Sequence, residues 1–505
     1  MAQKFRITYA TLSADNEDLQ RAYDEAVERV RAELGKDYPI VVNGQERWTD
    51  ETYEEPSPID QGLIVGRFAQ ASAGDVADAV AAAKAFTLEW DRIGWAERVR
   101  ILRNVADIME DRLFDLAAMM AYEVGKNRLE ALGDVQETAE LIRWNCDEME
   151  KADGFRVPMS GLGAAGDYYD VLRPHGVWAV ISPFNFPMAL SGGPSSGALV
   201  AGNCVVLKPS NQGALLGYKL YECYRDGGVP AGAFHLLSGR GHVAGEALWR
   251  HPDVNGITFT GSYAVGMEIY KHFASEVPKP VICEMGGKNP TIVTSKADID
   301  KATDGVLRSA FGFGGQKCSA CSRVYVARDV YDRFVQELRA KTEKIKVGDP
   351  IQRDVYLGPV INERAVETFE EASEEARKRG TIVTGGQRIS EGELGKGLFV
   401  EPTVVEVPDD SFIWHKELFV PFVAVAPFDD LDDAIERAND TEYGLTAGFF
   451  SEDKAEVDEW LDRIQAGVVY VNRRAGSTTG AWPGVQPFGG WKGSGTTGKA
   501  GGGPY

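Results

Sequence analysis

Cys318 and Cys321 stand three residues apart in the segment GQKCSACS, where their thiols could do chemistry. A cysteine thiolate can attack a carbonyl carbon and hold the product as a covalent thioester. The same spacing is also typical of redox pairs and of half a zinc site. The six His residues form no ligand cluster, and the segment runs from a Gly-rich turn into a strand-like stretch, so we expect neither a metal nor a redox disulfide. We interpret Cys318 as a nucleophile; the alternative is a small buried apolar residue.

Two further side chains suit a thioester mechanism, which needs a base to activate water and a donor to hold an oxyanion. Glu284 follows an apolar run in the Gly-containing segment ICEMGGKNP, and Asn185 lies in ISPFNFP. Each has an ordinary alternative. Glu284 could be a solvated surface carboxylate, and Asn185 a turn residue in front of Pro187.

Short apolar runs separated by helix-length segments must position these side chains. The first four runs cover residues 177–182, 204–208, 234–238 and 254–260. Strands connected in this way predict βαβ units and a parallel sheet covered on both faces. Because parallel strands end at one edge of a sheet, the residues after these runs are expected to line one crevice: Asn185, Lys208, Gly239, Gly241, Gly261 and Ser262.

A second α/β pattern begins near Met285. Its apolar runs cover residues 324–326, 381–384, 398–405 and 422–427, and a long helix is predicted near 330–345. Ahead of both patterns, Ser72 three residues before Asp75 predicts the start of an Ala-rich helix. A chain of 505 residues with these patterns is expected to form two or three domains of an α/β fold.

Two segments resemble phosphate-binding turns. FTGSYAVG, residues 259–266, follows a predicted strand and opens a helix, so Ser262 and the helix amides could hold a pyrophosphate; the alternative is a Gly that serves turn geometry. GSGTTGKA, residues 493–500, matches the phosphate-loop spacing, but Ala500 replaces the hydroxyl that binds magnesium and no helical segment follows. We therefore exclude a nucleoside triphosphatase.

The composition narrows the class of partner. The formal net charge of −22 repels nucleic acids and anionic membrane surfaces, so neither is expected as a partner. We find no signal peptide and no apolar stretch long enough to span a bilayer, and six sparse Cys fit a reducing compartment. The sequence therefore predicts a cytoplasmic enzyme.

Seven motifs occur along the chain in the order ISPFNFP, LKPSNQ, FTGS, EMGGKNP, GQKCSACS, KELFVPF and QPFGG. In this order they resemble the aldehyde dehydrogenase superfamily from about Tyr53 onward. The resemblance implies NAD(P)-dependent oxidation of an aldehyde to an acid. It also implies a Rossmann-type parallel-sheet cofactor domain (1–160 and 175–283), a second α/β catalytic domain (284–483) and a small β oligomerisation element (161–174 and 484–505).

The resemblance also assigns roles. It makes Cys318 the nucleophile, Asn185 the oxyanion donor together with the Cys318 amide, and Glu284 the base that hydrolyses the thioester. Asn211 replaces an acid that NAD-preferring members often carry, so NADP is expected to be accepted beside NAD; Val420 replaces a Gly of many members. The implied cofactor-binding residues are Ser182, Lys208, Ser210, Asn211, Gly241, Gly261, Ser262, Glu417 and Phe419.

Within the superfamily, GFGGQKCSACSR and the tail from TTGAWPG onward are similar to the 1-pyrroline-5-carboxylate dehydrogenase family. This implies oxidation of L-glutamate 5-semialdehyde to L-glutamate in proline catabolism. Ser319, Gly480 and Ala481 would anchor the α-carboxylate of this substrate, and Phe186 and Phe488 would pack on its aliphatic stem. Trp482 and Pro483, next to the anchor, depart from the family pattern.

Three alternatives to this substrate stay open at this point. The chain could oxidise another semialdehyde or an aliphatic aldehyde, transfer the acyl group to CoA, or bind a dinucleotide without catalysis. The presence of Cys318, Glu284 and Asn185 disfavours the last of these. Residues 167–172 resemble the family's protruding arm, so we expect a homo-oligomer, a dimer or larger.

Overall fold

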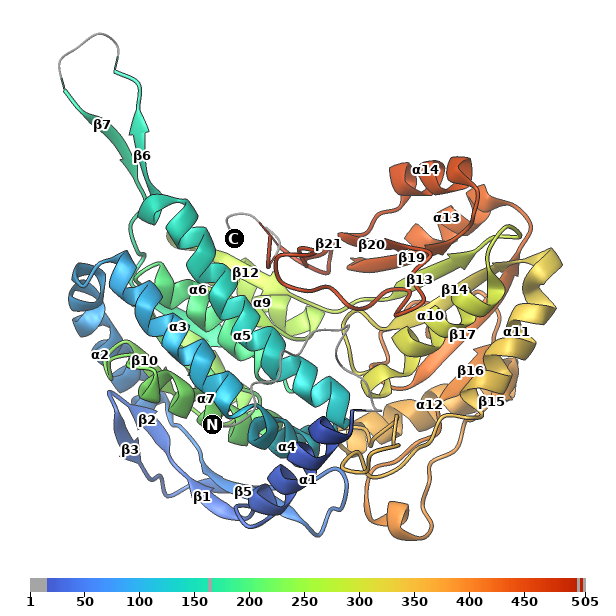
Figure 1. Cartoon of the computed structure of the whole chain (residues 1–505), viewed down its shortest axis with the longest axis horizontal. Coiled ribbons are helices and arrows are strands. Elements are labelled where there is room, and N and C mark those ends of the chain that lie inside the picture. Colours follow the sequence, from blue (N-terminus) through green and yellow to red (C-terminus); the bar gives the residue numbers. More distant parts are fainter. Residues whose placement is uncertain (1–15, 162–165, 497–499, 503–505) are drawn as a thin grey trace.

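The computed structural model describes residues 16–161, 166–496 and 500–502, which form two lobes, each around a seven-stranded sheet (Figure 1). The first lobe, blue to green in Figure 1, lies beside the second, yellow to red, and a two-stranded arm projects from the first lobe. The chain passes from one sheet to the other across residues 285–288. None of the helices in the described ranges is long and apolar enough to cross a membrane.

The first sheet is parallel except at one edge. Across it the strands are β12 (Val281–Glu284), β11 (Val254–Thr260), β8 (Val177–Ile181), β9 (Cys204–Lys208), β10 (Phe234–Leu236), β2 (Ile40–Val42) and β3 (Gln45–Arg47). The predicted runs 204–208 and 254–260 coincide with β9 and β11. The antiparallel strands β2 and β3 correct the expectation of a wholly parallel sheet. Their turn, Asn43-Gly44, has positive φ at both residues (50° and 71°), the geometry of a tight hairpin.

Helices cover both faces of this sheet, since all residues of β9 are buried. The predicted start at Ser72 is confirmed: its hydroxyl accepts from the Asp75 N–H, and the Asp75 carboxylate accepts from the Ser72 N–H. The helices of this lobe are α1 (Glu17–Arg31), α2 (Ala73–Arg92), α3 (Trp95–Asp111), α4 (Leu113–Val124), α5 (Arg128–Lys151), α6 (Ala189–Val200), α7 (Ala214–Asp226), α8 (Glu246–Trp249) and α9 (Tyr263–His272).

The second sheet runs in the order β15 (Thr381–Thr384), β16 (Thr403–Glu406), β17 (Phe422–Phe428), β14 (Cys321–Ala327), β13 (Asn289–Val293), β19 (Thr446–Phe450) and β20 (Val468–Val471). Only its edge strand β15 is antiparallel. Neighbouring residues of β13 enter different cores, Ile292 on one face and Val293 on the other. Its helices are α10 (Ile299–Phe311), α11 (Arg328–Thr342), α12 (Glu363–Arg379), α13 (Leu431–Asn439) and α14 (Lys454–Arg463).

The predicted run 398–405 is too long at its start. Strand β16 begins at Thr403 because Pro402 has no N–H to offer a ladder. Before it, Phe399 O accepts from Ile389 N–H, and Glu401 N–H donates to Gln387 O, so residues 398–401 pair with a loop instead.

Three small sheets complete the described fold. The first has β1 (Lys36–Tyr38), β5 (Ile64–Ala69) and β4 (Thr52–Pro56). The projecting arm pairs β6 (Arg156–Met159) with β7 (Tyr168–Val171), which falls within the predicted segment 167–172 (Figure 1). The third pairs β18 (Tyr443–Gly444) with β21 (Trp491–Lys492). Residues 162–165, 497–499 and 503–505 of the proposed oligomerisation element, including part of GSGTTGKA, lie outside the described residues.

Candidate active site

The ends of the parallel strands meet at one edge of the first sheet. Ile181 is paired with both Lys208 and Phe259, and Thr260 is paired with Glu284, so these four strands end level with one another. The Gly261 N–H also donates to Glu284 O at 3.0 Å. The predicted base therefore lies at the same edge as the predicted cofactor residues.

Cys318 lies on the second lobe, between the short 3-10 helix Gly312–Gly315 and β14. Its backbone is held by Asn289, whose Nδ2 donates to the carbonyl oxygens of Cys318 at 2.7 Å and Ala320 at 2.9 Å. The Asn289 Oδ1 accepts from the Thr446 N–H at 3.0 Å. Asn289 thus fixes the chain on both sides of the nucleophile, and the sequence analysis missed it.

The electrostatic surroundings of Cys318 keep its thiol protonated at neutral pH. Burial, together with the negative charges of Glu417 and Glu284, raises the pKa of the thiol to about 12. The backbone amides of Ser319 and Cys318 act in the opposite direction. A proton must therefore leave Cys318 when the thiol attacks.

Glu284 is buried without compensation. It is 8% exposed, and neither carboxylate oxygen has a hydrogen-bond partner in the described part of the chain. Burial raises the pKa of this carboxyl to about 8. A buried carboxyl with free oxygens and a raised pKa is suited to accept a proton from water.

The C-terminal segment holds the loop that carries Glu284. Ser494 O accepts from the Met285 N–H at 2.9 Å, and the Ser494 hydroxyl donates to Gly286 O at 2.7 Å. Thr496 exchanges two further bonds with the Cys283 backbone, at 2.9 and 3.1 Å. Part of the segment 484–505 thus contacts the site within one chain; its role in oligomers stays a prediction.

Two polar groups of the predicted cofactor edge are buried, the Lys208 ammonium and the Asn211 side-chain oxygen. Lys208 is 5% exposed, its Nζ donates to Pro209 O at 2.9 Å, and burial lowers its pKa to about 8. Asn211 Oδ1 is buried and has no hydrogen-bond partner among the described residues. A ribose, whose hydroxyls both donate and accept, fits this pair.

The other predicted residues of this edge are held by local contacts. The Ser182 hydroxyl shares a 2.7 Å hydrogen bond with Ser191, and the Ser210 hydroxyl accepts from the Gln212 N–H at 3.2 Å. Ser262 is the N-cap residue of α9, and its side chain forms no cap bond within the described structure. Because helix N-termini in general attract anions, this end of α9 stays the predicted pyrophosphate site. Gly241 begins a single π-helical turn with open space around its Cα.

Glu417 and Phe419 approach this edge from the second lobe. Glu417 Oε1 accepts from the Gly287 N–H at 2.8 Å, and burial raises the pKa of Glu417 to about 7. Phe419 has a φ of 60°, and its ring meets Phe184, next to Asn185, edge to face with centroids 6.0 Å apart. The predicted clamp therefore touches the loop that carries the predicted oxyanion donor.

Thr478 connects two of the chain segments that carry the predicted carboxylate anchor. The Thr478 hydroxyl donates to Ser319 O at 2.7 Å, which ties the residue after Cys318 to the loop of Gly480 and Ala481. Thr478 thus joins the Ser319 backbone to the segment that leads to Gly480 and Ala481, and the anchor role of these three residues stays a prediction. Phe488 lies further along, where its backbone exchanges two hydrogen bonds with Ala500 at 2.7 and 2.8 Å.

A charged face of α5 is the main feature that the sequence analysis missed. Asp134 forms a fully buried ion pair with Lys126 at 2.8 Å, and the Lys126 Nζ lies 3.6 Å from the ring centroid of Phe186. Glu130 pairs with Lys317, directly before Cys318, at 2.5 Å. The spacing of these acids, with Glu137 one turn further, is the i, i+4, i+7 signal that could have revealed them.

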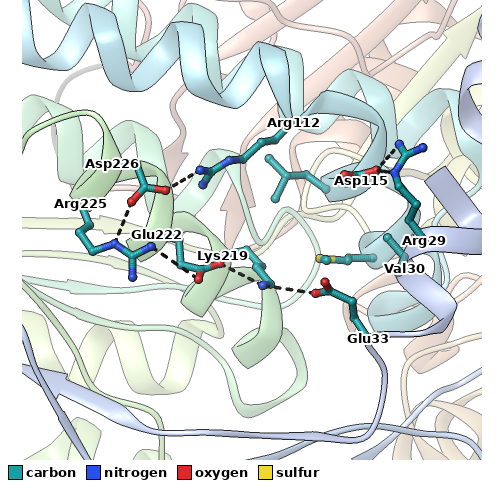
Figure 2. A pocket seen from close by; sticks show the side chains of 11 residues that line it. Arg29, Val30, Glu33, Arg112, Asp115, Lys219, Glu222, Arg225 and Asp226 are labelled. Carbon is teal, nitrogen blue, oxygen red and sulfur yellow. Dashed lines mark hydrogen bonds and ion pairs between the residues drawn. The ribbon is translucent and has the colours of Figure 1, made fainter.

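A cavity of about 320 Å³ lies elsewhere in the first lobe, among α1, α4 and α7 (Figure 2). Each of its charged side chains forms an ion pair with another lining residue, so none is left for a ligand. Figure 2 shows these pairs, which join Arg29 to Asp115, Arg112 and Arg225 to Asp226, Arg225 and Lys219 to Glu222, and Lys219 to Glu33.

Comparison with known proteins agrees with this geometry. A model of the aldehyde dehydrogenase family matches residues 46–505. A 1-pyrroline-5-carboxylate dehydrogenase of Geobacillus sp. (strain WCH70) is 38% identical over 493 residues, 96% of this chain and 94% of that protein. The structure of a 1-pyrroline-5-carboxylate dehydrogenase from Thermus with bound NAD superposes with a TM-score of 0.92 at 34% identity, covering 99% and 97% of the two chains. That of a 3,6-anhydro-L-galactose dehydrogenase gives 0.87 at 33%, covering 92% and 96%.

Proposed function

This chain belongs to the aldehyde dehydrogenase family and is an NAD-dependent aldehyde dehydrogenase, and from that premise we propose that its substrate is L-glutamate 5-semialdehyde. This aldehyde is the open form of 1-pyrroline-5-carboxylate, and its oxidation yields L-glutamate in proline catabolism. The observation that carries the proposal is the hydrogen bond from the Thr478 hydroxyl to Ser319 O, which joins the residue after the nucleophile to the segment leading to Gly480 and Ala481, the other two residues of the predicted carboxylate anchor. Full-length relatives at 36–38% identity bear the matching name.

Cys318 and Asn185 carry out the first step. The Cys318 sulfur attacks the aldehyde carbon as its thiol proton passes to solvent water, and the carbonyl oxygen becomes an oxyanion. The Asn185 side chain and the Cys318 N–H stabilise that oxyanion. Loss of a hydride from the same carbon then leaves a thioester on Cys318.

NAD supplies the hydride acceptor when it is bound. Lys208 and the unpaired Asn211 Oδ1 would hold the adenosine ribose, and Ser262 with the amides of α9 the pyrophosphate. Glu417 and Phe419 would hold the nicotinamide ribose. The buried Oδ1 of Asn211, which has no hydrogen-bond partner among the described residues, is the observation that the cofactor fits.

Glu284 carries out the last step. Its carboxylate accepts a proton from water as the water oxygen attacks the thioester carbon. The C–S bond breaks, the acid leaves, and Cys318 is regenerated. Neither Glu284 oxygen has a hydrogen-bond partner among the described residues, so either can accept that proton.

The substrate proposal is tested by comparing initial rates of NADH formation. We expect kcat/KM for 1-pyrroline-5-carboxylate to exceed that for succinate semialdehyde and for an aliphatic aldehyde by about 10-fold or more, because an unmade charged hydrogen bond costs about that much. The same series with NADP is expected to give turnover as well, because Asn211 presents no charge to repel a 2′-phosphate. Equal or faster oxidation of the other aldehydes would remove the substrate assignment and leave the chemistry intact.

We also propose that the arm of β6 and β7 joins copies of this chain. The arm exposes several apolar side chains to solvent, with Val157 51%, Met159 55% and Tyr169 45% exposed. Light scattering is expected to give at least a dimer mass, and V157D, which charges the arm, to lower it. A monomer mass for the unaltered chain would rule this role out.

A further inference from the structure

The loop that forms the proposed anchor is held from behind by one arginine. Arg473 Nη1 donates to Thr479 O, and Arg473 Nη2 donates to Gly480 O at 3.2 Å. A Cβ on Gly480 would lie 2.4 Å from that Nη1, and the φ of Gly480 is 105°. A side chain at position 480 would therefore push the guanidinium off the loop.

The two carbonyl contacts fix the direction of the two amides that the anchor uses. In a trans peptide the C=O and the next N–H point in opposite directions. Arg473 donates hydrogen bonds to the carbonyl oxygens of Thr479 and Gly480. The N–H groups that follow these carbonyls, those of Gly480 and Ala481, must therefore face away from the guanidinium. Neither amide donates to a backbone carbonyl among the described residues.

The charge of Arg473 is not cancelled locally. Within the described residues it has no carboxylate within ion-pair distance, whereas its neighbour Arg474 pairs with Asp300 and Asp304. Arg473 also lies over the ring of Tyr470, with its Cζ 4.9 Å from the centroid. The Tyr470 hydroxyl is buried, and burial raises its pKa to about 12, whereas the charge of Arg473 and the nearby Ala481 amide act in the opposite direction. The Arg473 cation, which has no carboxylate partner among the described residues, therefore lies close to the Tyr470 hydroxyl and to the Gly480 and Ala481 amides.

The chain is folded to place Arg473 there. Asn472, directly after β20, has a φ of 51°, and its side chain exchanges two hydrogen bonds with the Ser451 backbone at 2.8 and 3.1 Å. This reverses the chain so that Arg473 lies back over Tyr470.

We propose that Arg473 is the positioning residue that makes this enzyme select aldehydes ending in a carboxylate. It turns the Gly480 and Ala481 amides toward the substrate and adds an uncompensated positive charge behind them. The inference rests on the proposed function, because it assumes that residues 480–481 receive the far end of the substrate. It goes further by naming a residue outside the motif and the substrate feature that it selects.

The test compares three aldehydes with five-carbon chains: L-glutamate 5-semialdehyde, glutarate semialdehyde and pentanal. Glutarate semialdehyde keeps the terminal carboxylate without the ammonium group, and pentanal has neither. Arg473→Gln is expected to raise KM for the two acids by about 10- to 100-fold, the size of a lost charged hydrogen bond, with kcat much less affected. For pentanal the change is expected to be several times smaller. Arg473→Lys keeps the positive charge but cannot bind both carbonyl oxygens in the same way, so we expect it to reverse only part of the rise in KM for the two acids.

Arg474→Gln is the matched control, because Arg474 is the adjacent arginine and its charge is already paired. We expect the Arg474→Gln variant to have the same KM and kcat as the unaltered enzyme for all three substrates. If Arg473→Gln slows pentanal as much as the acids, or leaves all KM values unchanged, the role of Arg473 is refuted. If the unaltered enzyme prefers glutarate semialdehyde to glutamate semialdehyde, the proposed function fails while the role of Arg473 stands.

Discussion

Cys318→Ser is expected to lower kcat for NADH formation by about 10³-fold or more, because a hydroxyl lacks the nucleophilicity of a thiolate and its alkoxide is far less accessible. NAD binding should persist, since the predicted cofactor residues lie on other segments. Steady-state NADH formation measures the first quantity, and isothermal titration with NAD measures the second. Because Asn289 holds the Cys318 backbone through carbonyl contacts, the smaller side chain leaves the loop in place.

Cys321→Ser provides the control for this prediction. Cys321 is the second thiol of the C-x-x-C segment, but it is buried in the core beside the Thr291 hydroxyl at 3.2 Å. We expect this variant to keep kcat within about 3-fold, at a stability cost of about 1 kcal/mol for a polar replacement in a core. The nucleophile is misassigned if Cys321→Ser abolishes turnover while Cys318→Ser does not.

The sequence predicted those parts of the fold that depend on local patterns. Strands β9 and β11 were predicted residue for residue, because each is an apolar run bounded by turn residues. The hairpin of β2 and β3 was missed although Asn43-Gly44 is a strong hairpin signal, because strands so short and flanked by polar residues lack a long apolar run. The start of β16 was predicted too early because the apolar run was taken as one strand, although Pro402 interrupts it.

The residues of the candidate site also fall into those that the sequence predicted and those that it did not. Cys318, Glu284 and Asn185 belong to motifs whose residues are adjacent in sequence, so they could be identified there. Asn289 and Arg473 act through contacts between segments that only the fold brings together. No pattern of residue spacing in the sequence predicts these contacts. Their functions depend on which carbonyl a side chain reaches, and that is a property of packing.

Glu284→Gln is expected to separate the two halves of the reaction. Acylation does not need the Glu284 carboxylate, so a first turnover should release about one NADH per active site as a burst. Hydrolysis of the thioester does need it, so the steady rate after the burst should fall by about 10²-fold or more. In the unaltered enzyme, ionised Glu284 increases as pH rises through its pKa of about 8, so the hydrolysis rate should rise with pH there. The variant should lose this rise, which stopped-flow traces across the pH range would measure.

Other groups near the site titrate in the same range, so the pH profile needs a second line of evidence. Burial raises the pKa of Glu417 to about 7 and that of Glu137 to about 8, and lowers that of Lys288 to about 7. Hydroxylamine attacks thioesters without a protein base, so it should restore turnover to Glu284→Gln but not to Cys318→Ser. If the variant shows no burst, or if hydroxylamine leaves its steady rate unchanged, Glu284 acts before the thioester forms. Its free, buried oxygens would then serve to take the proton from the Cys318 thiol.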